Sequence, residues 1–243
     1  MKRFLLFAGM MILVMIVINS CKKEEPLPPT FEELLTGGSA AAAGKTWVLS
    51  KGTYPANDGG GPVTNAMPAL IAIPADIQTI LGDIYDTEFT FFSDGKYTIK
   101  PMNGKVLGAT LYSTLNAVVV TGTENALGLC HANFAEVTNG TWTLHEEDFT
   151  VDAITNPLDA ATPPVHGDVT FTGKKWLSFN TGSYFGILDG NAMSHVIIKE
   201  VTETEMHVAL MVCMYQGVMN PGGLDYATYP THIFQLTYVP KAK

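Results

Sequence analysis

The sequence predicts an all-β fold, either a β-sandwich or a β-barrel, for most of the 243-residue chain. Beyond residue 44 the chain divides into short runs rich in Thr, Val, Tyr and Phe, which are the residues that suit a pleated surface. Turn signals such as Asn139-Gly140 and Asp189-Gly190-Asn191 separate these runs. No internal repeat of fixed period accompanies them. Short strands separated by such turns are typical of sandwiches and barrels.

Residues 1–20 predict a cleaved export signal. Lys2 and Arg3 form a short basic region, and residues 4–18 carry no charge or strongly polar group. As a helix, the apolar run would be about 22 Å long at roughly 1.5 Å per residue, which is shorter than a bilayer core of about 30 Å. A signal peptide therefore fits better than a membrane-spanning anchor.

The export signal ends in Val17-Ile18-Asn19-Ser20-Cys21, which resembles the lipobox of bacterial lipoproteins. The resemblance implies cleavage before Cys21 and lipidation of its thiol, and two or more acyl chains suffice for stable membrane anchoring. An ordinary signal peptide that contains a cysteine is the alternative.

Residues 21–36 predict a lipidated cysteine followed by a tether. Lys22-Lys23-Glu24-Glu25 resembles the surface-export signal of Bacteroidota lipoproteins, and the prolines that follow make the chain stiff and extended. The resemblance implies an outer-membrane protein that faces the cell exterior, and a merely solvated charged linker is the alternative. Thr30 to Leu35 favours one helical turn with Thr30 as N-cap, which Gly37-Gly38 ends.

Cleavage before Cys21 leaves 223 residues with 12 basic and 23 acidic side chains, a formal charge of −11. This balance argues against nucleic acid as a partner, because the phosphate backbone requires cationic side chains. Cys130 and Cys213 could form a disulfide outside the cytoplasm. Both lie in apolar runs, where buried thiols are common, so the two interpretations stay open.

Residues 37–243 predict a single β domain with a long Gly-, Pro- and Ala-rich loop at about 52–83. The clearest element is a hairpin, Glu88 to Phe92 and Lys96 to Ile99, joined by Asp94-Gly95. The other predicted strands are 45–51, 105–111, 117–121, 140–144, 149–153, 169–172, 176–179, 184–188, 196–201, 206–215 and 233–239.

Three passages together resemble surface lipoproteins of Bacteroidota polysaccharide-utilisation loci. The first is residues 34–38 followed by 44–49, the second is residues 85–91 leading into 94–97, and the third is Tyr184 to Gly190 followed by 195–198 and 202–208. They are spread over much of the chain from residue 34 to about 212, and they occur in the order in which the family has them. The resemblance implies a jelly-roll-like β-sandwich, binding of an extracellular glycan, and an outer-membrane importer as neighbour. The chain departs from the family at residues 67–71, which lack an aromatic platform, so the fold transfers better than any particular ligand.

Aromatic side chains are the predicted ligand contacts, because sugars stack their apolar C–H faces on rings. The candidates are Trp176 and the loop residues Tyr54, Tyr215, Tyr226 and Tyr229. Trp47 and Trp142, like Trp176, lie among apolar neighbours, where tryptophan commonly anchors a β core.

No catalytic residue and no cofactor are predicted. Glu146 and Asp148 match the first two acids of the Glu-x-Asp-x-x-Glu motif of laminarinase-type jelly-roll enzymes, but Val151 occupies the third position. The histidines show no metal-ligand spacing. Asp58-Gly59-Gly60-Gly61 could hold a structural Ca²⁺, although one carboxylate favours a plain loop.

The sequence thus predicts a non-catalytic, lipid-anchored surface protein that binds polysaccharide or oligosaccharide for uptake. A structural or adhesive protein that binds another protein subunit is the first alternative. A glycoside hydrolase that uses Glu146 or Asp148 is the second.

Overall fold

The computed structural model describes residues 27–38, 43–50, 69–70, 85–109, 113, 120–121, 129–154, 165–180, 183–188, 195–212, 229–230 and 232–242. Phe31–Lys243 form one compact unit, and Met1–Thr30 form another. Cys21, the export signal and the Asp58 loop lie outside the described residues. Within the described part of the chain, no helix is long and apolar enough to cross a membrane.

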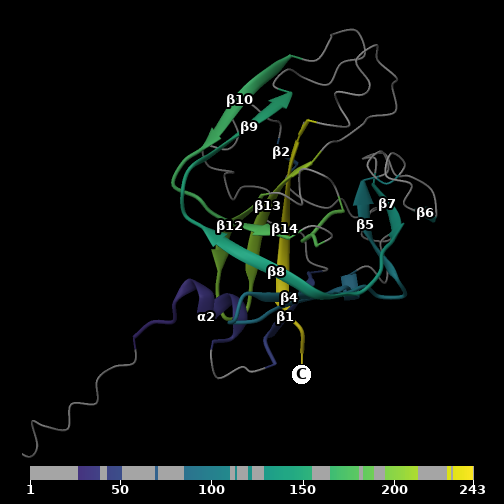
Figure 1. Ribbon diagram of the computed structural model, residues 1–243, viewed down its shortest axis with the longest axis vertical. Coiled ribbons are helices and arrows are strands. Elements are labelled where there is room, and N and C mark those ends of the chain that lie inside the picture. The colour runs from purple at the N-terminus through teal and green to yellow at the C-terminus, as the bar shows by residue number, and fades with distance from the viewer. Residues whose placement is uncertain are drawn as a thin grey trace, which may run out of the picture. The chain divides into compact units, whose positions relative to one another are not determined.

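The described elements are one short helix and a succession of strands (Figure 1). They are α2 (Phe31–Thr36), β1 (Lys45–Leu49), β2 (Ala69–Leu70), β3 (Glu88–Phe91), β4 (Lys96–Lys100), β5 (Lys105–Ala109), β6 (Val120–Thr121), β7 (Leu129–Asn133), β8 (Val137–His145), β9 (Phe149–Ile154), β10 (His166–Phe171), β11 (Lys175–Phe179), β12 (Val196–Val201), β13 (Met206–Val212) and β14 (His232–Pro240).

The main sheet closes into an eight-stranded antiparallel barrel in the order β1-β3-β4-β8-β11-β12-β13-β14. Strand β14 closes it, because Tyr238 to Pro240 pair with β1 while the preceding residues pair with β13. Barrel neighbours follow chain order, so the topology is up-and-down, with the other strands inserted in the connections. The all-β prediction is confirmed, but this sheet forms a barrel and not the jelly-roll-like sandwich that the family resemblance implied.

The barrel interior is filled by side chains, including those of residues 183–188. The run Tyr184 to Leu188 was predicted as a strand, yet it is an irregular buried segment with one bridge, from Leu188 to Gly108. The Phe185 ring packs against Phe89 of β3 and Tyr238 of β14, with centroid distances of 4.9 and 4.4 Å. We call residues 183–188 the plug. Because rings from several barrel strands surround it, the plug occupies the space that a ligand would need inside an eight-stranded barrel.

A second apolar cluster covers the outer face of strands β11 to β14. The hairpin β9–β10 contributes Phe149, Val169 and Phe171, and the barrel wall contributes Trp176, Ile197, Ala209, Met211 and Ile233. The inner face of the same strands packs on the barrel core through residues such as Leu177 and Val208. These strands are therefore buried on both faces, which explains the continuous apolar runs in their sequences.

The predicted strands from β3 to β6 are confirmed in position, although several are shorter than predicted. Strand β7 was missed, and it is the central strand of the small sheet β5-β7-β6. Strand β2 lies inside the predicted loop at about 52–83 and pairs in parallel with β14. Cys130 on β7 is buried, and Cys213 lies outside the described residues.

Helix α2 confirms the predicted helical turn, and it packs with the β domain although it was assigned to the tether. Leu35 is fully buried in the barrel core. The indole Nε1 of Trp47 donates a hydrogen bond of 2.9 Å to the carbonyl of Leu35. The Lys45 ammonium donates to the carbonyls of Leu34 and Glu203, at 2.8 and 3.2 Å. The compact β domain therefore begins at Phe31.

Candidate functional site

The structure describes two of the predicted ligand residues, Trp176 and Tyr229. Tyr54, Tyr215 and Tyr226 lie outside the described residues. The candidate site is built around Trp176, because this side chain lies at the outer face of the barrel among polar groups that the sequence did not connect.

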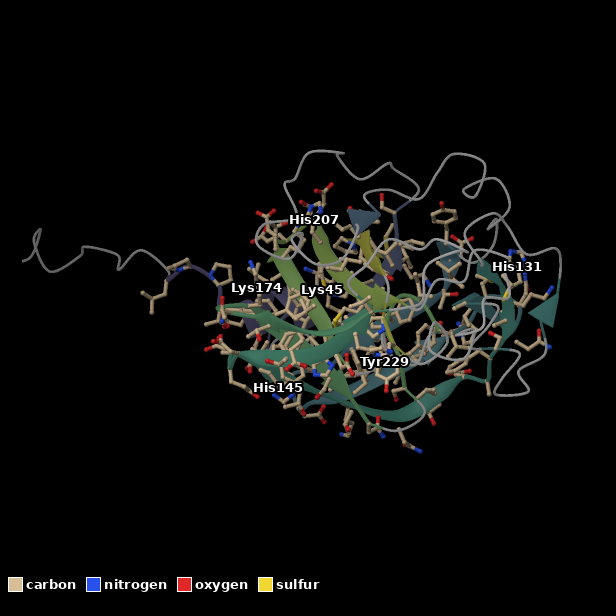
Figure 2. All side chains as sticks on the ribbon, turned by 90° about the horizontal axis from the view of Figure 1, so that it is seen from above. Lys45, His131, His145, Lys174, His207 and Tyr229 are labelled. Carbon is tan, nitrogen blue, oxygen red and sulfur yellow. The ribbon has the colours of Figure 1, made fainter. Side chains whose placement is uncertain are left out.

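Strands β8 and β11 bring Trp176 and His145 together. The antiparallel register places the two residues directly opposite each other, and their side chains point to the outer face. The imidazole stacks on the indole with a centroid distance of 3.8 Å and an interplanar angle of 9°. Trp176 is only 8% exposed, whereas the His145 side chain is 22% exposed. Figure 2 shows His145 at the outer margin of the strands. The ring that faces solvent is thus the imidazole, with the indole behind it.

Both ring nitrogens of His145 have partners in the protein. Nδ1 lies 2.7 Å from Oε1 of Glu147, which is two residues along the chain. Nε2 lies 2.8 Å from Oγ of Ser178, which is paired with Thr143 and therefore diagonal to His145. Together with the stack on Trp176, these bonds fix the imidazole at two edges and one face. We call Trp176, His145, Glu147 and Ser178 the imidazole shelf.

The Glu147 carboxylate is held at the surface by two neighbours. Its Oε2 accepts a hydrogen bond of 3.1 Å from the backbone N–H of Glu146, while Oε1 is bonded to His145. A backbone hydrogen bond and then the His145 bond lower the pKa of Glu147. The side chain is 64% exposed, so it presents a fixed negative charge at the edge of the imidazole shelf.

Two further rings support the shelf from below. His195 stacks on Phe149 at 4.6 Å, and both rings lie against Trp176 at 4.6 and 5.0 Å. The Trp176 Nε1 donates to the carbonyl of Glu147 at 3.0 Å, so the buried indole has its hydrogen bond. Burial, followed by the proximity of His145, lowers the pKa of His195. The layer beneath the shelf is therefore neutral and closely packed.

The two acids considered for glycoside hydrolysis hold the edge of this region together. Glu146 forms an ion pair with Lys175. The Oδ1 of Asp148 accepts a hydrogen bond of 2.9 Å from the backbone N–H of Gly173. Both carboxylates thus fasten the turn after β8 to the turn before β11.

Tyr229 belongs to a different place on the surface. Its ring meets His166 edge-on at 4.4 Å, and Nδ1 of His166 lies 3.5 Å from Oδ1 of Asp152. His166 and Phe171 are at opposite ends of β10. At about 3.3 Å per residue they are roughly 16 Å apart, so the structure does not bring Tyr229 to the imidazole shelf.

The other two tryptophans lie in the barrel core. Trp47 is fully buried, and Trp142 is buried with its Nε1 bonded to the carbonyl of Phe92 at 3.2 Å. The described residues contain no group of three or more His, Cys, Asp or Glu side chains arranged to hold a metal ion.

Sequence reasoning missed His145, Ser178 and His195. Ser178 is 33 residues from His145 along the chain, and only the strand register makes them neighbours. A histidine followed two residues later by an acid was the one local signal that pointed to this site.

Comparison with protein-family models gives no match, and no curated protein matches the chain.

Proposed function

We propose that the protein is a lipid-anchored lipoprotein of the outer cell surface that binds extracellular polysaccharide or oligosaccharide for uptake by a neighbouring importer. The observation that carries the proposal is the imidazole shelf. A flat ring, 22% exposed and fixed at both edges, lies beside an exposed carboxylate and a hydroxyl. The segment ending at Cys21, which resembles a lipobox, supports the location.

The chemistry of the shelf suits a sugar. A pyranose presents an apolar C–H face, which packs on an aromatic ring, and equatorial hydroxyls, which bond to carboxylate and hydroxyl oxygens. The His145 ring provides the first contact, and Glu147 and Ser178 provide the second. Because Trp176 holds the imidazole in place before a ligand arrives, binding costs little ordering of side chains.

The outer location of the shelf agrees with the filled barrel. The plug residues Tyr184, Phe185 and Ile187 are buried within the barrel core. A glycan chain is also too long for a closed lumen, whereas an outer wall lets it extend in both directions. Strand β8 offers such a wall, because Thr141 and Thr143 continue the exposed face beside His145.

A glycan array with the full chain in detergent tests the proposal. We expect retention on at least one polysaccharide, and competition by the same soluble sugar. A His145→Ala variant should lose that retention. His207→Ala is the matched control, because His207 is another partly exposed histidine of the wall, bonded to Glu205 and Thr237 at 3.3 Å each. No retention on a broad set of polysaccharides, combined with stable capture of one protein partner, would favour an adhesive or structural protein instead.

A further inference from the structure

We propose that Ser178, His145 and Glu147 form a serine triad that cleaves esters, with acyl esters on glycans as the substrate class. The choice of glycan esters rests on the proposed function, whereas the reactivity of Ser178 does not. Such an activity differs from the non-catalytic function that the sequence predicts. The triad hydrolyses ester bonds on the glycan and does not cleave its glycosidic bonds.

The three groups stand in the order that a nucleophilic serine requires. Ser178 Oγ lies 2.8 Å from Nε2 of His145, and Nδ1 of the same ring lies 2.7 Å from Oε1 of Glu147. A hydroxyl bonded to one imidazole nitrogen and a carboxylate bonded to the other define a nucleophile, a base and a group that orients the base. The arrangement is recognised by this geometry and not by position in the sequence.

The base and its orienting group are held in place independently of any substrate. Stacking on Trp176 fixes the plane of the His145 ring, and the Glu146 N–H fixes the second oxygen of Glu147. His207 shows what an ordinary surface histidine looks like in this fold. Its ring nitrogens lie 3.3 Å from Oε2 of Glu205 and 3.3 Å from Oγ1 of Thr237. The shorter bonds at His145 therefore distinguish it from a residue of the same type on the same wall.

The reaction follows from these positions. Ser178 Oγ forms a bond to the ester carbonyl carbon as its proton passes to Nε2 of His145. The bond between the acyl carbon and the sugar oxygen then breaks, and the sugar leaves as an alcohol whose oxygen takes the proton from His145. Water adds to the acyl-Ser178 carbonyl, giving its proton to His145, and the carboxylic acid departs as Ser178 regains a proton. In the reaction Glu147 is a positioning residue, because it stabilises the imidazolium and does not touch the ester group that reacts.

The site stabilises an oxyanion less well than a fast serine hydrolase does. Ser178 pairs with Thr143 in the β8–β11 ladder, so the strand backbone around it is committed to the sheet. Loss of one oxyanion donor costs about 10²–10³ in kcat. Turnover should therefore be slow, and covalent trapping of Ser178 should report its activation more sensitively than turnover.

A fluorophosphonate probe tests the triad in the full chain. Ser178 Oγ would attack phosphorus and fluoride would leave, so the adduct can be located by peptide mass spectrometry. We expect labelling at Ser178 that Ser178→Ala abolishes and that His145→Ala slows at least tenfold. His207→Ala and heat-unfolded chain are the controls, with labelling at the wild-type rate and no labelling respectively. Thermal melts of each variant separate loss of reactivity from loss of folding.

The role of Glu147 needs a readout that a structural residue would not change. Glu147→Gln should lower the labelling rate and move its pH dependence, because the groups left near His145 would be the neutral His195 ring and the Glu146–Lys175 ion pair. Glu146→Gln is the matched control and should leave the pH profile unchanged. Failure to label Ser178 in folded protein, or equal labelling in His145→Ala, would overturn the triad.

Two ester substrates test the triad and the proposed glycan function separately. Acetate release from p-nitrophenyl acetate, absent in Ser178→Ala, supports the triad whatever the natural ligand. Release from an O-acetylated polysaccharide at a higher kcat/KM supports the glycan-ester class. Glycan binding without any Ser178 labelling would leave the proposed function standing and refute the triad. Labelling of Ser178 without glycan binding would support the triad and refute the proposed function.

Discussion

The imidazole of His145 covers one face of the Trp176 indole, with ring centroids 3.8 Å apart and planes inclined by 9°. This pair connects the exposed imidazole to the buried rings beneath the Trp176 indole. Trp176 packs downward on Phe149 and His195, while His145 turns its free face to solvent and its edges to Glu147 and Ser178. Trp176 therefore serves mainly stability, and His145 is the residue of the pair that we propose to contact the glycan.

Replacement of the buried member should cost stability. Trp176→Ala removes a large side chain from the cluster under the hairpin β9–β10 and should lower the free energy of unfolding by about 3–5 kcal/mol. His145→Ala should cost about 1 kcal/mol, because it removes one stacking contact from a partly exposed ring. Urea unfolding followed by fluorescence measures both. Equal losses would show that the indole does not anchor the cluster.

The plug should be sensitive to a single methyl group. Gly186 has φ of 91°, and a Cβ there would lie 2.4 Å from Cδ1 of Leu210. Gly186→Ala combines backbone strain with overpacking and should destabilise the fold by about 2–5 kcal/mol. Gly173→Ala is the control, because Gly173 has φ of 62° with open space around the added Cβ, and it should cost about 1 kcal/mol. A neutral Gly186→Ala would contradict a filled barrel.

Stability should fall as the pH drops below about 6.5, the ordinary pKa of histidine. Burial lowers the pKa of His195 in the folded state, so the unfolded chain binds a proton first. The stabilisation is complete above the unfolded pKa and is lost as the pH falls toward the folded pKa. Glu147, whose pKa is also lowered, adds to the loss at lower pH. Urea midpoints at pH 7.5 and 5.5 measure this effect. His195→Phe should flatten the dependence between these values.

Lys45 should hold helix α2 on the barrel. Its ammonium donates to the carbonyls of Leu34, Thr202 and Glu203, and it lies 4.1 Å from the Trp47 ring centroid. Lys45→Met should destabilise the protein by about 2 kcal/mol, since hydrogen bonds to charged groups contribute about 1.5–3 kcal/mol. Hydrogen exchange should then increase in Phe31–Thr36. Lys96→Met, at a surface ion pair with Asp94, should change neither quantity.

Local chemistry explains what the sequence predicted correctly. The hairpin β3–β4 follows from alternating apolar residues and from Asp94-Gly95, where Gly95 adopts φ of 79°. The helical turn before Gly37, with φ of 82°, follows from the same kind of signal. Such turns depend on a few neighbouring residues, so they can be predicted without knowing how distant strands pair.

Long-range pairing explains what the sequence did not predict. Closure of the barrel depends on Tyr238 to Pro240 meeting β1, nearly 200 residues earlier, and no local pattern specifies that partner. The apolar run Tyr184 to Leu188 has strand composition, but its surroundings in the core make it the plug. The imidazole shelf has the same origin, because the β8–β11 register brings Ser178 to His145.

The affinities of two histidine variants test most directly whether the imidazole shelf binds glycan, as we propose. Titration calorimetry of the best array ligand should give a Kd for His145→Ala at least tenfold weaker than wild type, a loss of about 1.4 kcal/mol. His207→Ala should bind as wild type does. An unchanged Kd in folded His145→Ala, or an equal loss in both variants, would contradict the proposal and place the glycan elsewhere on the protein.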